Sequence, residues 1–256
     1  MKANASSAVN ALKGNALLKA DLRRMFTTSR LWIFLLTCLV VPILILTMTT
    51  AFGSEGESAS MPPITSAWSL IGSTGGMTMD MTAMMNINLV FFAAGIFLCL
   101  FVADDFRSGY AKNLFTVHAA KGKYVTAKTV TGILAGALML CAFFIGTMLG
   151  GAFAGLSFSL VNATAVNVIL CLLAKMLLMG VMIPIFLATA CFSKGKSWMS
   201  ILLSLFIGML LFMIIPMMSP LNTGIMQVVL CAAGSVMFTV GLSIVSKMIL
   251  SKEDLV

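Results

Sequence analysis

The sequence LWIFLLTCLVVPILILTMTTAF occupies residues 31–52 and contains no charged side chain. Crossing the hydrocarbon core of a bilayer takes about 20 helical residues, so this stretch is long enough to span a membrane. Because lipid offers the backbone no hydrogen-bond partners, such a span must be helical. A secretory signal peptide is the alternative, but 30 residues precede the run and its apolar part is longer than such peptides use. We therefore expect a membrane-spanning helix here.

Five further stretches have the same character, and none alternates apolar with polar residues as the strands of a membrane β-barrel do. The six predicted spans are 31–52, 81–103, 128–154, 168–192, 198–218 and 224–246. Of the 256 residues, 60% are hydrophobic and 9% charged, whereas a soluble domain carries about 25% charged residues. This composition excludes a soluble enzyme, a disordered tail and a nucleic-acid-binding domain. We expect an all-α, polytopic membrane protein with a single domain over residues 1–256.

The basic residues predict the orientation of the spans. Fifteen of the 16 Lys and Arg residues lie before the first span, between the second and third with Lys128 at the boundary, between the fourth and fifth, or after the sixth. The intervening loops 53–80, 155–167 and 219–223 contain no Lys or Arg. Because Lys and Arg concentrate in cytoplasmic loops, both termini are expected to be cytoplasmic. The net charge of +8 then orients the helices rather than attracting an acidic ligand.

Residues 11–29 carry an amphipathic helical pattern. Its apolar residues are Leu18, Leu22, Met25 and Phe26, and its basic residues on the other side are Lys19, Arg23 and Arg24. Such a helix would lie in the membrane plane with its leucines in the acyl chains. The alternative is a basic flank that only sets the topology.

The segment 104–127 carries a second pattern. Asp104 and Asp105 would cap a helix, with metal binding as the alternative. The apolar stripe that follows consists of Phe106, Tyr110, Leu114 and Val117, and the residues off the stripe are Arg107, Lys112 and Asn113. A helix of this kind would dock into a groove on a cytoplasmic partner or lie flat on the lipid.

Lys175 is the one formal charge within a predicted span. If the fourth span begins near Met176, its side chain extends to the outer headgroups. Alternatively, it faces the bundle interior or the substrate. No acidic residue lies within a predicted span to pair with it, so an ion-coupled transporter or channel would lack its usual carboxylates.

No catalytic set or metal site is evident. His118 is the only histidine, and the six cysteines show no CxxC spacing, so paired-histidine and thiolate metal sites are not expected. Lys194-Gly195-Lys196-Ser197 resembles the end of a phosphate-binding loop, but Ala190 stands where that loop needs glycine. The chain therefore carries no recognisable ATP-binding motif.

Two further patterns concern packing and the outer mouth of the second span. Five methionines cluster there: Met77, Met79, Met81, Met84 and Met85. Thioethers bind Cu(I), so a copper route is the alternative to plain apolar filling. The third span contains three GxxxG pairs, which allow close helix approach: Gly132 and Gly136, Gly146 and Gly150, and Gly151 and Gly155.

One segment carries a resemblance to a known family. It reads Ala103-Asp104-Asp105-Phe106-Arg107-Ser108-Gly109-Tyr110-Ala111-Lys112-Asn113-Leu114, followed by Lys123-Tyr124 and Ala127-Lys128. It resembles the acidic-Phe-x-x-Gly-(Thr)-x-Lys-x-Leu and Arg/Lys-x-Tyr-x-x-x-Lys stretches of the membrane permease subunits of type 2 ABC transporters. Tyr110 stands where threonine is common, and His118 where Ser or Pro is more usual. The six-span topology is also similar.

This resemblance implies a coupling helix at 106–118 that seats in a separate cytoplasmic ATPase subunit, and an elbow helix at 11–29. The implied coupling residues are Asp105, Phe106, Arg107, Gly109, Tyr110, Lys112, Leu114 and Val117, and those of the elbow helix are Leu18, Leu22, Arg23 and Met25. Two permease halves, identical or homologous, would enclose the substrate path, for which Lys175, Met81 and Met85 are candidates. This chain itself would bind no cofactor, since ATP and Mg²⁺ belong to the partner.

The expected function is that of an exporter permease in a bacterial plasma membrane. By analogy with similar small permeases, including phenol-soluble-modulin exporters, the substrate would be an amphipathic or lipophilic peptide toxin or antimicrobial peptide. The alternatives are an ion-coupled secondary transporter or channel, and a copper-related ABC permease using the outer methionines.

Overall fold

The computed structural model of the protein describes residues 16–52, 66–72, 86–118, 121–158, 160, 163–193, 196–212 and 218–252. These residues form helices, with no strand among them and only one isolated bridge, between Ser66 and Ser157. Residues 16–27 form the first helix. The long helices are α2 (Ser29–Phe52), α4 (Leu89–Arg107), α6 (Lys121–Phe153), α7 (Ala165–Phe192), α8 (Ser197–Phe212) and α10 (Ile225–Lys252).

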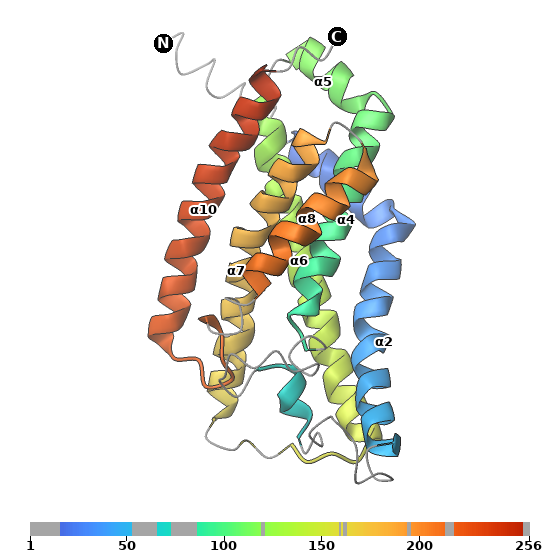
Figure 1. The fold of residues 1–256 in the computed structure, drawn as a ribbon, viewed down its shortest axis with the longest axis vertical. Coiled ribbons are helices and arrows are strands. Elements are labelled where there is room, and N and C mark those ends of the chain that lie inside the picture. The colour runs from blue at the N-terminus through green and yellow to red at the C-terminus, as the bar shows by residue number, and fades with distance from the viewer. Residues whose placement is uncertain are drawn as a thin grey trace.

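Two short helices mark the ends of the bundle. The helix α5 (Tyr110–His118) lies at one end, and the 3₁₀-helix η1 (Ala67–Leu70, teal) lies at the other (Figure 1). We refer to these as the α5 end and the η1 end. The N-terminus of α4 points to the η1 end and its C-terminus to the α5 end (Figure 1).

Five helices are long and apolar enough to cross a membrane, namely α2, α4, α6, α7 and α10. The apolar helix α8 corresponds to the predicted fifth span but is shorter, with 16 residues, and residues 213–217 lie outside the described part of the chain. The all-helical, multi-pass membrane character is therefore confirmed. The count of six spans and the orientation of the termini stay predictions.

Several helix boundaries differ from the sequence prediction, and at α4 and α6 charged residues enter the helix. The predicted span 81–103 corresponds to α4, which begins at Leu89 and continues through Asp104 and Asp105 to Arg107. The predicted span 128–154 corresponds to α6, which begins at Lys121. Asp104 and Asp105 therefore lie in the last turn of α4 and do not cap the following helix.

Small residues set the closest helix contacts, as the GxxxG spacings predict. A Cβ atom on Gly146 of α6 would overlap the carbonyl oxygen of Leu39 in α2, and one on Gly150 would lie 2.8 Å from the Ile43 Cα. On another face of α6, a Cβ atom on Gly136 would lie 2.8 Å from the Met179 Sδ in α7. The helix α6 thus packs tightly between α2 and α7.

The remaining helices complete one bundle around a shared apolar core. α4 packs against α6, α7 and α8, while α10 packs mainly along α7. Large aromatic side chains fill the centre, including Phe91, Phe97, Phe143 and Phe186, all buried. The outer faces of α2 and α10 stay exposed and strongly apolar, as expected for helix surfaces that contact lipid.

Candidate functional site

The connection between α4 and α5 bends at Gly109. This residue has a φ of +72°, in the left-handed region that favours glycine. The Ser108 amide still bonds to the Asp104 carbonyl at 2.9 Å, so α4 ends directly before the bend. The predicted single helix over residues 106–118 is therefore interrupted, because the backbone changes direction between Phe106 and Tyr110.

The apolar side of α5 faces the protein. Ala111 and Phe115 are buried, and Leu114 packs against the core, as does Phe106 at the end of α4. The Phe115 ring meets the Tyr124 ring of α6 edge-on, with centroids 5.3 Å apart. Phe106, Tyr110 and Leu114 of the predicted stripe are thus half-buried against the bundle, and the docking of this stripe to a partner stays a prediction. The side chain of Val117 lies outside the described residues.

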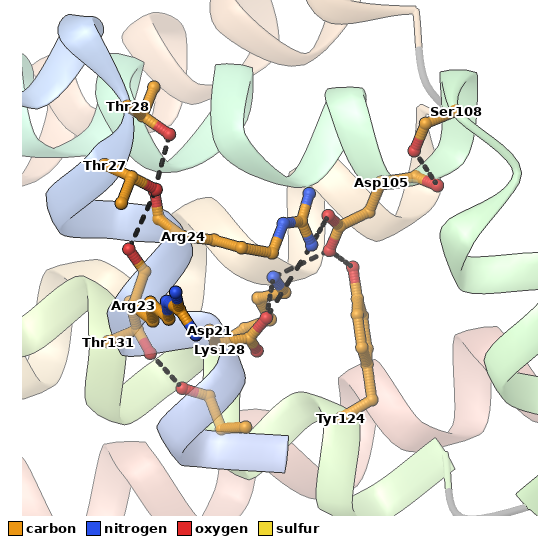
Figure 2. Close-up of polar contacts among 11 residues, drawn as sticks. Asp21, Arg23, Arg24, Thr27, Thr28, Asp105, Ser108, Tyr124, Lys128 and Thr131 are labelled. Atoms are coloured by element: carbon orange, nitrogen blue, oxygen red, sulfur yellow. Dashed lines mark hydrogen bonds and ion pairs between the residues drawn. The ribbon is translucent and has the colours of Figure 1, made fainter. Parts of the chain in front are cut away.

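A buried charge cluster lies beside α5, formed by Asp21, Arg24, Asp105 and Lys128 (Figure 2). The Lys128 Nζ is 2.7 Å from the Asp105 Oδ2 and 2.9 Å from the Asp21 Oδ1. The Arg24 guanidinium donates to the other Asp105 oxygen at 2.8 Å. Two positive and two negative charges thus neutralise each other where helix 16–27, α4 and α6 meet. We call these four residues the charge cluster.

Aromatic side chains close the charge cluster. The Tyr124 hydroxyl donates to the Asp105 Oδ2 at 3.0 Å. The Lys128 Nζ lies 4.0 Å from the centroid of the Phe101 ring, and the Arg24 Cζ lies 4.6 Å from that of Tyr110. Rings facing a desolvated cation stabilise it by their quadrupole. Through Tyr110, the first residue of α5, the cluster connects this helix to helix 16–27 and α6.

Helix 16–27 turns a polar strip toward the protein, which the amphipathic pattern does not predict. Leu22 and Met25 pack against the core, so part of this apolar side meets protein, and Leu18 is half-buried. Arg24, predicted on the opposite side, points inward to Asp105, whereas Phe26 is 44% exposed. Arg23, an implied elbow residue, is exposed as expected for its basic side. The predicted residues 11–15 lie outside the described part of the chain.

Burial and charge act in opposite directions within the cluster. Burial raises the pKa of the Asp21 carboxyl, although Lys128 beside it favours the charged form. The Asp21 Oδ2 has no hydrogen-bond partner, which agrees with a carboxylate that is incompletely solvated. Burial alone would lower the pKa of Arg24, but the adjacent Asp105 outweighs it and the pKa is raised. Burial and the nearby carboxylates also raise the pKa of Tyr110.

Further polar contacts tie the helices together at the α5 end. Arg30, at the start of α2, forms an ion pair with Asp104 of α4. Arg107 donates to the Ser197 hydroxyl at 2.9 Å, which joins α4 to the start of α8. On α5 itself, Lys112 is exposed. Of the implied coupling residues, the structure thus brings Asp105 and Tyr110 together with Arg24 and leaves Lys112 at the surface.

Lys175 lies in the bundle interior, so the alternative in which its side chain extends to the outer headgroups is wrong. It is fully buried in α7, ten residues after the helix begins at Ala165. Its ammonium donates to the Asn88 Oδ1 at 2.9 Å and to the Ser219 Oγ at 3.0 Å. A side chain that reached the headgroups would be exposed at its tip. The extension of α7 beyond the predicted start at residue 168 places Lys175 deeper than expected.

The other candidate path residues cannot be placed. Met81 and Met85, with the rest of the outer methionine cluster, lie outside the described residues. Among the residues that the structure describes, no group of three or more His, Cys, Asp or Glu side chains is arranged to hold a metal ion. An apolar groove of about 230 Å³ lies between α2 and α4, lined on one side by Ile33, Phe34 and Thr37 and on the other by Leu89, Phe92 and Ile96.

Asp21 is the member of the charge cluster that the sequence analysis misses. One feature of the sequence could have identified it: Asp21 is the only acidic residue in the first 54 positions and lies within a run of basic residues. Tyr124 and Lys128 lie in the family-like stretch, but their partners Asp105 and Asp21 lie 19 and 107 positions away. Asn88 and Ser219 carry no pattern that distinguishes them.

The comparisons with known proteins give one match. Residues 27–211 match the family model described as ABC-2 family transporter protein. No curated protein and no solved structure matched the sequence.

Proposed function

Because the chain belongs to the ABC-2 transporter family and is a membrane permease of an ABC transporter, we propose that it exports an amphipathic or lipophilic substrate under the power of a separate ATPase subunit. The permease is the membrane transport component and not the catalytic ATPase. Two such halves, identical or homologous, would enclose the substrate path in a bacterial plasma membrane. A peptide toxin or antimicrobial peptide is the substrate class proposed.

The observation that carries this proposal is the attachment of α5 to three other helices. The charge cluster and the ring of Tyr110 connect α5 with helix 16–27, α4 and α6. A displacement of α5 by an ATPase would therefore move the ends of two spans together, because close-packed helices shift as units. We propose α5 as the coupling helix on this ground. For contact with the ATPase we propose a surface of α5 other than the apolar stripe given above.

That contact surface is the exposed side of α5, where Lys112 lies. Phe106 and Leu114 pack against the core, so replacing them would disturb the permease itself. An exposed cation on a coupling helix suits an acidic groove, since complementary charge orients and stabilises docking. The apolar groove between α2 and α4 would accept the apolar part of a substrate from the lipid.

The test uses the full-length permease expressed together with the ATPase encoded beside its gene. Lys112→Glu is expected to lower co-purification of the ATPase and permease-stimulated ATP hydrolysis by about tenfold, as a charge reversal in an interface does. Lys19→Glu is the matched control, because Lys19 is an exposed cation on helix 16–27. If Lys112→Glu retains both activities while the wild-type pair shows them, α5 is not the coupling helix.

A further inference from the structure

Among the residues that the structure describes, the region around Lys175 contains donors but no acidic residue. Lys175, Asn88 and Ser219 are all fully buried, near the start of α4 and at the η1 end of α7. The described acidic residues Asp21, Asp104 and Asp105 all lie at the other end of the bundle. Within the described part of the chain, no carboxylate therefore neutralises the Lys175 ammonium. Burying an unpaired cation in a membrane bundle is costly, and such residues commonly serve substrate binding.

A second donor lies beside the ammonium. The Asn88 Oδ1 accepts from Lys175 at 2.9 Å, whereas the Asn88 Nδ2 is buried without any hydrogen-bond partner. Covalent geometry places the two ends of an amide about 2.3 Å apart, so the Nδ2 is held close to the ammonium. An ammonium has three hydrogens to donate, and the contacts to Asn88 and Ser219 use two of them.

One oxyanion can accept from both donors, through one oxygen or two, and its negative charge would pair with the ammonium. We propose that Lys175 and Asn88 form a receptor for the oxyanion of an amphiphile, a carboxylate or a phosphate, with Ser219 orienting the ammonium. The anion supplies the charge that the described protein residues do not, and it satisfies the Asn88 amide. The site is closed in this structure, so a ligand enters when α4 or the segment carrying Ser219 separates from α7. This inference rests on the proposed export function only in treating the amphiphile as substrate.

The test measures binding to the full-length permease in nanodiscs of phosphatidylcholine, without any ATPase, so its failure leaves the export proposal untouched. The probes are dodecanoate and dodecanol, which share one chain and differ in the anionic group. Wild-type protein is expected to bind dodecanoate at least about tenfold more tightly than dodecanol, the size of one charge-assisted hydrogen bond. Equal binding of the two probes by the wild type would overturn the proposal.

Two variants assign the preference to this site. Lys175→Gln removes the charge and is expected to abolish the preference for dodecanoate. Asn88→Asp keeps the shape and gives Lys175 a built-in carboxylate, so it is expected to fold and to lose the preference as well. Lys19→Gln, the same charge loss on exposed helix 16–27, should retain it. Retention of the preference in Asn88→Asp would contradict the receptor.

Two controls identify what fills the site. The outer-loop acids Glu55, Glu57 and Asp80 lie outside the described residues. If one of them paired with Lys175, its replacement by the matching amide would create the preference and the wild type would lack it, against the proposal. Adding phosphatidylglycerol to the nanodiscs distinguishes the sources of the oxyanion. Displacement of dodecanoate supports the receptor with a lipid headgroup as its ligand, and unchanged binding supports it with a transported amphiphile.

Discussion

Lys128 and Asp105 form an ion pair of 2.7 Å in which both side chains are fully buried, and the same ammonium lies 2.9 Å from Asp21. A single cation on α6 therefore holds carboxylates from α4 and from helix 16–27. Desolvating these charges is expensive, so the arrangement is stable only while all partners are present. Because each charge depends on its partners, the charge cluster holds helix 16–27, α4 and α6 together.

Lys128→Met should destabilise the protein strongly. The substitution keeps an apolar side chain of similar length but leaves Asp21 and Asp105 with one cation between them. Breaking a buried ion pair by removing one partner costs about 3–5 kcal/mol. Thermal unfolding of the purified protein in detergent measures the loss, and Lys19→Met, at an exposed position, should change it little.

The double variant Lys128→Met with Asp21→Asn tests whether the loss of stability in Lys128→Met comes from the unbalanced charge. It removes one positive and one negative charge, leaving Arg24 paired with Asp105 at 2.8 Å. It should therefore be more stable than Lys128→Met alone, a coupling that neighbouring residues show and distant ones do not. Simple addition of the two single losses would mean that Lys128 acts by packing instead of charge.

The stability of the protein should also depend on the protonation of Asp21. Burial raises the pKa of this carboxyl in the folded state, so the folded protein binds its proton at pH values where the unfolded chain has released it. The resulting stabilisation is fully present below the ordinary aspartate pKa and is lost as the pH rises through the raised folded value. Other acids titrate as well, so the quantity to measure is the melting temperature of the wild type minus that of Asp21→Asn between pH 4 and 8. This difference should fall with rising pH, and a rise would show that Lys128 dominates over burial.

The sequence predicts the presence of the helices correctly, but it predicts their boundaries poorly where charged residues lie at the ends. Six apolar runs and the alternation of basic residues indicate the bundle, and five of the runs correspond to helices long enough to span. The clearest errors are at α4, which extends to include Asp104 and Asp105, and at α6, which extends to include Lys121 and Lys123. A hydropathy pattern ends a span at the first charges, because it cannot represent a partner that neutralises them from another helix. The same reason explains Lys175, whose polar partners lie 87 and 44 positions away.

The site could be predicted only in part for a related reason. The family-like segment identifies Asp105, Tyr110, Tyr124 and Lys128 as a set, but not what each contacts. The apolar stripe through Phe106 and Leu114 is real, yet amphipathicity alone does not state whether a face meets lipid, a partner or its own bundle. Here the face packs inward, and the single glycine at 109 decides this by redirecting the chain.

Gly146 and Gly234 should respond in opposite ways to substitution by alanine. A Cβ atom on Gly146 would overlap the Leu39 carbonyl oxygen, whereas one on Gly234 in α10 would meet nothing within 4 Å. Gly146→Ala is expected to cost about 1–3 kcal/mol by overpacking the contact between α6 and α2. Gly234→Ala should instead gain about 0.5–1 kcal/mol, because alanine loses less backbone entropy in a helix. Thermal unfolding of both variants decides the matter, and similar effects at both positions would indicate that α2 and α6 are not in close contact.

Gly109 provides the sharpest test of the bend between α4 and α5. Its φ of +72° suits glycine, and no heavy atom lies within 4 Å of the place where a Cβ would stand. Any cost of substitution therefore comes from backbone strain and not from a clash. Gly109→Ala should lower the free energy of unfolding by about 1–2 kcal/mol, the penalty for an ordinary residue in this conformation. Gly109→Asn should lower it less, although asparagine is larger, because its side chain tolerates left-handed backbone. If the loss instead increased with side-chain size, the bend would be limited by space, and α4 and α5 would have to approach each other more closely than they do here.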